Sequence, residues 1–174
     1  MGDIITGDNM KKISLCLILF SFSLLVGCTL GNTPTARVED MLSKYQMLDN
    51  SINISYTSLT TDTNLGQDII NGYEKSIEKQ YRNLSYEVKD EVIDGDTATV
   101  TIQIEVMNYK DAINRYNKND YELVRYHELV IEALKDTKDT ITYTLDITLT
   151  KDNSDNWSID TLTTENINKL LGIY

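Results

Sequence analysis

Apolar residues follow a helical period in the first part of this 174-residue chain. Thr33 and Pro34 have the residue types expected at a helix N-cap and at the first helical position. The apolar positions that follow are mostly three or four residues apart, at Val38, Met41, Leu42, Tyr45 and Leu48 and then at Ile69, Ile70, Tyr73, Ile77 and Tyr81. This spacing predicts two amphipathic helices, over 34–48 and 67–82.

Two later segments alternate apolar and polar residues, which is the period of a half-buried strand. Their apolar positions are Ala98, Val100, Ile102, Ile104 and Val106, and then Ile141, Tyr143, Leu145, Ile147 and Leu149. Asp94-Gly95-Asp96 predicts a tight turn that joins the first segment to a preceding strand. The remaining pattern predicts a helical region over 111–136, a short strand in 157–162 and a last helix over 164–171 that ends at Gly172.

This order of elements predicts an α+β fold. Strands with one apolar face and one threonine-rich face favour a curved antiparallel sheet of about four strands, in two hairpins, covered on one face by helices. We expect residues 34–174 to form a single domain, because no repeat or low-complexity linker interrupts them.

The N-terminal region has a different character. Lys11 and Lys12 precede the apolar run Ile13–Gly27, which is too short to span a bilayer and is typical of a secretory signal sequence. We therefore predict a signal peptide with a helical apolar part over 1–27. Acidic residues near Met1 do not suit the basic start of such a peptide, which makes Met10 a second candidate for the start of translation.

The run ends in Leu25-Val26-Gly27-Cys28, which resembles the lipobox of bacterial lipoproteins. The resemblance implies that Cys28 receives a diacylglyceryl thioether, with acyl chains such as palmitate, and becomes the first residue after cleavage. Residues 28–33 would then be the lipidated cysteine and a short tether that holds the domain at the outer face of the cell membrane. Two acyl chains give stable anchoring, whereas a single chain binds only marginally.

The formal net charge of −11 limits the partners of the chain. It argues against nucleic acid, whose binding needs cationic side chains, and against attraction to anionic lipid head groups. We therefore expect membrane contact through the lipid on Cys28, with a small molecule, a peptide or an envelope protein as a further partner. The other cysteine, Cys16, lies in the predicted signal peptide, so the mature chain has no intramolecular disulfide.

Catalytic and metal-binding patterns are weak in this sequence. His127, the only histidine, shares a helical face with apolar residues, so we interpret it as a partly buried packing residue and not as a general base. Glu105 and Asp146 alternate with threonines and are expected to point away from the core. Asp152–Asn156 resembles the start of a calcium loop without its Gly and Glu. We predict no catalytic, cofactor-binding or metal-binding residue, and no cofactor.

Three segments resemble small lipoproteins of Gram-positive bacteria: YEVKDEVIDGDTATV at 86–100, ITYTLDITLTK at 141–151 and WSID at 157–160. The domain of that family is similar to the NTF2-like, cystatin-like architecture, which implies a curved sheet wrapped around helices. Enzymes with this architecture keep their sites inside the curve of the sheet. The resemblance therefore makes Tyr86, Tyr109 and Tyr143 candidates for lining a pocket there.

Three functions are compatible with these features. The first, which we expect, is a non-enzymatic, membrane-anchored module that binds a ligand or a protein of unknown identity. The second is a small NTF2-like enzyme acting on an apolar ligand, which a hollow of about 300 Å³ or more with a carboxylate inside would favour. The third is an envelope-maintenance protein that acts by contacts alone, which a filled sheet interior and an exposed apolar patch would favour.

Overall fold

The computed structural model describes residues 31–174, and residues 32–174 form one compact unit. The predicted signal peptide, the lipobox residues Leu25, Val26 and Gly27, and Cys28 lie outside the described residues. The helical elements are α2 (Pro34–Met47), η1 (Tyr56–Ser58), α3 (Gln67–Arg82), α4 (Tyr109–Ile113), η2 (Lys118–Asp120), α5 (Leu123–Asp136) and α6 (Thr164–Leu170). The strands are β1 (Ser85–Asp94), β2 (Thr97–Met107), β3 (Thr140–Lys151) and β4 (Trp157–Ile159).

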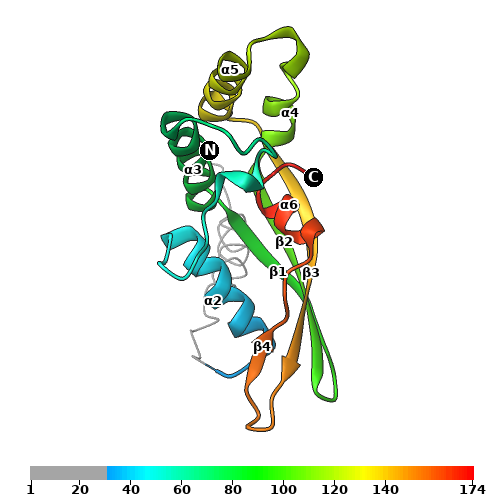
Figure 1. The fold of residues 1–174 in the computed structure, drawn as a ribbon. Coiled ribbons are helices and arrows are strands. Elements are labelled where there is room, and N and C mark those ends of the chain that lie inside the picture. The colour runs from blue at the N-terminus through cyan, green and yellow to red at the C-terminus, as the bar shows by residue number, and fades with distance from the viewer. Residues whose placement is uncertain (1–30) are drawn as a thin grey trace, which may run out of the picture. The chain divides into compact units, whose positions relative to one another are not determined.

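The four strands form one antiparallel sheet in the order β1-β2-β3-β4, which confirms the predicted α+β fold (Figure 1). Val100 pairs with Ile147 and Ile102 with Leu145, so the apolar faces of β2 and β3 coincide. Gly95 has a φ of 60° in the turn between β1 and β2, a conformation that suits glycine. The other side of these strands exposes the threonine-rich face, together with Glu105 and Asp146 as predicted.

Helix α2 begins as the sequence predicts. The side chain of Thr33 accepts a hydrogen bond of 3.1 Å from the backbone N–H of Ala36, and Pro34 occupies the first helical position. Just before the helix, the Asn32 side chain accepts a hydrogen bond of 3.1 Å from the backbone N–H of Trp157. The start of the described unit is thereby attached to β4.

The predicted helical region 111–136 is wrong as a continuous element. The structure divides it into α4, η2 and α5, with irregular backbone between them. The side chain of Asn108 accepts a hydrogen bond from the N–H of Asp111, and that of Asn117 from the N–H of Asn119. Asparagine side chains that bond to nearby backbone groups favour caps and turns over helix interiors.

The first hydrophobic cluster fills the space between the sheet and the helices α2 and α6. It is almost entirely aliphatic, and its buried members include Val38 and Leu42 of α2, Leu170 of α6, and the inward residues of β2 and β3. Since the opposite side of these strands is exposed, the helices cover one face of the sheet. The covered face is filled by side chains.

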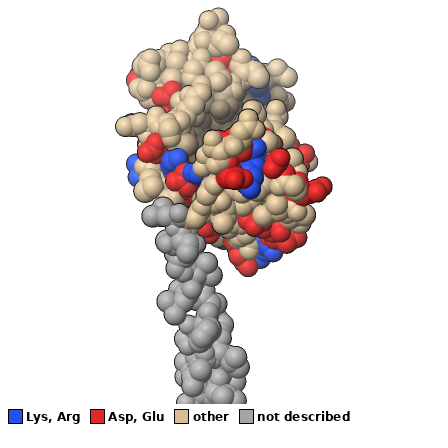
Figure 2. Space-filling model, turned by 90° about the horizontal axis from the view of Figure 1, so that it is seen from below, with Lys and Arg blue, Asp and Glu red and all other residues tan. Residues whose placement is uncertain are grey.

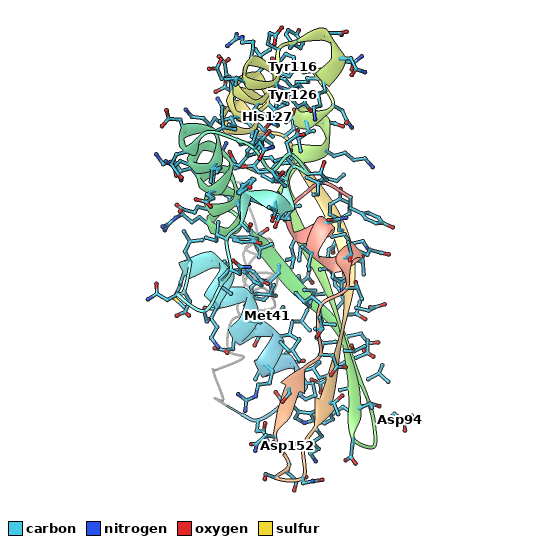
Figure 3. All side chains as sticks on the ribbon, in the orientation of Figure 1. Met41, Asp94, Tyr116, Tyr126, His127 and Asp152 are labelled. Atoms are coloured by element: carbon cyan, nitrogen blue, oxygen red, sulfur yellow. The ribbon has the colours of Figure 1, made fainter. Side chains whose placement is uncertain are left out.

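The second cluster lies under α3, α4 and α5, at the other end of the unit from the two hairpin turns that Asp94 and Asp152 mark (Figure 3). It is partly aromatic and includes Tyr73 and Tyr109, both almost fully buried. His127 is fully buried beside it.

Two residues from other segments contact the backbone of Met107, the last residue of β2. Gln80, fully buried on α3, donates to the carbonyl of Met107 over 2.9 Å and accepts from the N–H of Met107 over 2.8 Å, so it acts as a strand partner where β2 ends. Gly172 has a φ of 70° and its carbonyl accepts from the N–H of Lys110. A Cβ at Gly172 would overlap the Met107 carbonyl oxygen, so close backbone approach requires glycine there.

Candidate functional site

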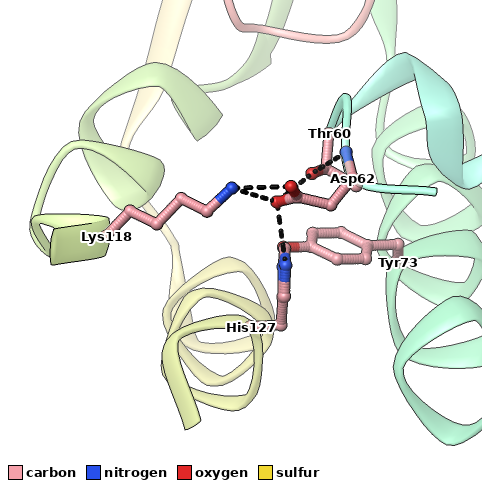
Figure 4. Close-up of polar contacts among 5 residues, drawn as sticks. All are labelled: Thr60, Asp62, Tyr73, Lys118 and His127. Atoms are coloured by element: carbon pink, nitrogen blue, oxygen red, sulfur yellow. Dashed lines mark hydrogen bonds and ion pairs between the residues drawn. The ribbon is translucent and has the colours of Figure 1, made fainter. Parts of the chain in front are cut away.

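An ion pair between Asp62 and Lys118 connects two loops near the second cluster. Asp62 lies in the irregular segment between η1 and α3, and Lys118 is the first residue of η2. The ammonium of Lys118 lies 2.6 Å from Oδ1 and 2.7 Å from Oδ2 of Asp62 (Figure 4). The hydroxyl of Thr60 accepts from the backbone N–H of Asp62 over 3.2 Å, which fixes the loop on which the carboxylate is carried.

His127 of α5 lies on the buried side of this pair. Its Nδ1 is 2.7 Å from the hydroxyl of Tyr73 on α3, and its Nε2 is 3.1 Å from Oδ2 of Asp62 (Figure 4). Although Asp62 is this close, Nε2 has no partner with hydrogen-bond geometry among residues 31–174. Both His127 and Tyr73 are closed to solvent, with exposed fractions of 0% and 1%.

The protonation states follow from this arrangement. Burial lowers the pKa of His127 below its ordinary value of 6.5, although the carboxylate of Asp62 opposes that shift. The hydrogen bond from Lys118 lowers the pKa of Asp62, and burial raises the pKa of Tyr73. At neutral pH we therefore assign a neutral imidazole that accepts the Tyr73 O–H at Nδ1 and carries its own proton on Nε2, facing the carboxylate.

An open depression of about 360 Å³ adjoins the ion pair. Its lining, which we call the Asp62 depression, consists of residues 57–62, Lys118 and Tyr126. The side chains of Asp62 and Lys118 are 23% and 48% exposed, so a ligand can touch both. His127 is fully buried and is not part of the lining, so a ligand in the depression meets the carboxylate and not the imidazole.

The structure places the three predicted pocket tyrosines apart. Tyr109 is fully buried, and its hydroxyl donates to the Ser76 carbonyl over 2.9 Å, so it fills the second cluster. Tyr86 and Tyr143 both pair with Ile104 and thus share one face of the sheet, two strands apart. Tyr86 borders a shallow depression of about 330 Å³, and the hydroxyl of Tyr143 donates to the Tyr174 carbonyl over 3.0 Å.

Two other depressions have unbalanced charge. One of about 470 Å³ lies between α3 and α5, where four carboxylates and one lysine surround two isoleucines: Asp68, Glu128, Glu132, Asp136, Lys135, Ile69 and Ile131. The other, of about 460 Å³, has Lys79, Lys135 and Lys138 with a single carboxylate, Glu105. Acidic side chains are widespread on the face that Figure 2 shows. Among the described residues, no three His, Cys, Asp or Glu side chains are grouped to hold a metal ion.

Sequence reasoning missed the partners of His127. It considered only the helical face that His127 shares with apolar residues, whereas Asp62, Tyr73 and Lys118 come from three other segments. The interpretation as a partly buried packing residue is corrected to a fully buried ring with a tyrosine hydrogen bond. The available signal was that His127 and Tyr73 both stand on the apolar faces of predicted helices, where polar groups need partners.

Comparisons with known proteins add little. No protein-family model matches this chain, and no curated protein matches it significantly. The chain is similar to a crystal structure from Bacillus subtilis, of the protein ycdA, described as "a putative lipoprotein". The two share 18% sequence identity with a TM-score of 0.41, over 78% of this chain and 44% of that one. The chain thus spans less than half of that protein, and similarity at this level supports no conclusion about function.

Proposed function

We propose that this protein is a lipid-anchored lipoprotein on the outer face of the cell membrane, and that it binds its ligand at the surface without catalysis. The sequence support for anchoring is the apolar run that ends in Leu25-Val26-Gly27-Cys28. The observation that carries the binding proposal is the Asp62–Lys118 pair, which is reachable in an open depression while the covered face of the sheet is filled. Within residues 31–174, no helix combines the length and the hydropathy needed to cross a bilayer.

The position of Cys28 supports a domain held close to the membrane. Cys28 precedes Asn32 by four residues, and a fully extended chain of that length reaches about 14 Å. Asn32 is already attached to β4 through the Trp157 N–H. A tether of this length keeps the end of the domain that carries Asn32 near the lipid.

A small enzyme is the second candidate, because the depression exceeds 300 Å³ and contains a carboxylate 3.1 Å from a histidine. A general base must reach the proton that it removes, either directly or through one water. His127 has no exposed surface, and its Nδ1 already accepts the Tyr73 hydroxyl. These two facts favour a structural role for the imidazole and a binding role for Asp62.

The anchoring proposal can be tested by replacing each cysteine in turn. Cys28→Ala removes the sulfur that would carry the lipid, so we expect no incorporation of labelled palmitate and no processing to the shorter chain. Cys16→Ala is the matched control, since Cys16 lies in the same apolar run but outside the lipobox. It should be labelled and processed as in the natural chain. Undiminished labelling of the Cys28→Ala protein would contradict the proposal.

A further inference from the structure

We propose that the Asp62 depression binds a neutral, polyhydroxylated ligand, of which a sugar ring of an oligosaccharide is the chemical type. This inference rests on the proposed binding function and specifies its ligand class. It follows from the charge balance, the hydroxyl content and the rigidity of the lining.

The charges in the depression cancel. Asp62 and Lys118 are its only charged lining residues, and Lys118 contacts both carboxylate oxygens. A cation would compete with Lys118 for Asp62, and an anion would compete with Asp62 for Lys118. A neutral ligand that carries both donors and acceptors does not have to displace either member of the ion pair, since the carboxylate can still accept from it and the ammonium can still donate to it.

The rest of the lining consists of short hydroxyls and two apolar surfaces. Ser58 and Thr61 each offer a hydroxyl that can donate or accept, while the hydroxyl of Thr57 already bonds to Ser55 and that of Thr60 to Asp62. Leu59 and the ring of Tyr126 supply apolar contact area. A sugar ring has this same combination, with hydroxyls around its edge and C–H groups on its faces. The volume of about 360 Å³ lies within the range of small-ligand sites.

The polar groups are already held in place without a ligand. Lys118 holds Asp62 from the η2 side, Thr60 holds its loop, and His127 lies behind it in the core. Ordering side chains on binding opposes affinity, so groups ordered beforehand bind at lower cost.

The two other charged depressions differ from the Asp62 depression in the kind of ligand that their charge favours. The depression between α3 and α5 has four carboxylates against one lysine and would favour a cation. The one beside Lys79 has three lysines against one carboxylate and would favour an anion. Of these three, the Asp62 depression alone has balanced charge.

Amide chemical shifts of the isotope-labelled domain, residues 29–174 in solution with Cys28 omitted, would test this inference. The probes are maltotriose and triacetylchitotriose as neutral sugars, with spermine and inorganic phosphate as charged controls. We expect at least one sugar to shift the amides of residues 57–62, Lys118 and Tyr126 in a saturable manner. Spermine and phosphate should leave these amides in place.

Two variants test whether the sugar binds in the Asp62 depression. Tyr126→Leu removes the ring while keeping apolar volume, and Lys118→Met removes the ammonium from an exposed position. Each should weaken sugar binding about tenfold, as expected for one lost contact. Thr148→Val, on the exposed face of β3, is the matched control and should bind as the parent does.

The outcomes separate the two proposals. Sugar shifts that map elsewhere, or persist unchanged in both variants, overturn this inference. Saturable shifts of the depression by spermine or phosphate also overturn it but retain a binding site there. If no probe shifts these amides, the sugar assignment is wrong, while palmitate labelling at Cys28 still decides the anchoring proposal independently.

Discussion

The two ends of the domain are stabilised by different kinds of contact. The cluster between the sheet and α2 is built from aliphatic side chains such as Leu42, Ile102 and Ile147, which need only volume and shape complementarity. The cluster under α3 and α5 buries hydroxyls and an imidazole next to its apolar groups, including Tyr73, Tyr109 and His127.

The two clusters differ because the buried polar groups of the second cluster need specific hydrogen-bond partners. Tyr109 donates to a backbone carbonyl of α3, Tyr73 bonds His127, and Thr137 donates to the carbonyl of Ala133. A buried polar group without a partner costs about 1–3 kcal/mol, so each of these positions depends on a specific atom elsewhere. The sheet region should therefore respond to changes in volume, and the helical region to the loss of single polar atoms.

The largest effect is expected at Gly172, which lies close to the backbone at the end of β2. In Gly172→Ala the new Cβ overlaps the Met107 carbonyl oxygen, and the φ of 70° is unfavourable for alanine. Steric overlap and backbone strain together should lower the free energy of unfolding by roughly 4 kcal/mol. Urea denaturation followed by circular dichroism measures this change.

Gly95 provides the matched control for that substitution. It also has a positive φ, of 60°, but a Cβ there meets no atom within 4 Å. Gly95→Ala should therefore lower the free energy of unfolding only through backbone strain, by roughly 1 kcal/mol. Equal losses in the two variants would show that the contact with Met107 does not constrain Gly172.

The second prediction compares the two clusters directly. Ile147→Ala leaves a cavity in the aliphatic cluster and should cost roughly 3 kcal/mol. Tyr109→Phe keeps the ring but leaves the Ser76 carbonyl without its side-chain donor, and should cost about 1–2 kcal/mol. Thermal and urea unfolding of both variants would measure these two losses of stability. A loss of under 0.5 kcal/mol in Tyr109→Phe would contradict the expected dependence of the second cluster on single polar atoms.

The third prediction concerns pH and the buried imidazole. Because burial lowers the pKa of His127 in the folded state, the unfolded chain binds more protons below its ordinary pKa of 6.5. The stabilising contribution is therefore complete above pH 6.5 and is lost as the pH falls toward the folded pKa. The chain has one histidine, so NMR titration of its ring resonances measures the folded pKa without assignment.

Tyr73→Phe sharpens this test, since it removes the donor to Nδ1 while keeping the ring. A buried nitrogen without its partner should cost about 1–3 kcal/mol of stability at neutral pH. A folded pKa of His127 at or above 6.5 in the parent protein would contradict the assignment of a neutral buried ring.

The smallest effect on stability is expected at Lys118. Its pair with Asp62 is partly exposed, and such pairs contribute about 0–1 kcal/mol, so Lys118→Met should unfold almost as the parent does. The hydrogen bond from Lys118 is the main cause of the lowered pKa of Asp62, so that pKa should rise in the variant. Carboxyl carbon shifts followed against pH would detect the change, and an unchanged pKa would contradict it.

Much of the fold could be predicted from the sequence. The predicted helices over 34–48 and 67–82 agree with α2 and α3 to within a residue, and the turn at Gly95 is confirmed. The alternation of apolar and polar residues along β2 and β3 also predicted which face of the sheet the helices cover. These features are local, because a strand or helix with one buried face repeats that face in its own sequence.

The candidate site could not be predicted in the same way. Lys118 and Asp62 are 56 residues apart, and Tyr73 and His127 are 54 apart. None of these positions has a sequence neighbour that would indicate its partner. The break between α4 and α5, which the helical pattern concealed, is what places Lys118 over Asp62.

The sequence by itself determined most of the secondary structure outside 111–136, the covered face of the sheet and the prediction of a lipid anchor at Cys28. The tertiary structure decided that Tyr109 fills the core, that His127 is closed to solvent and that Asp62 and Lys118 are open to a ligand. The physical reason is the separation along the sequence between the residues that determine each property. Periodic burial is encoded along a single element, whereas the protonation and accessibility of a side chain depend on atoms that other segments bring to it.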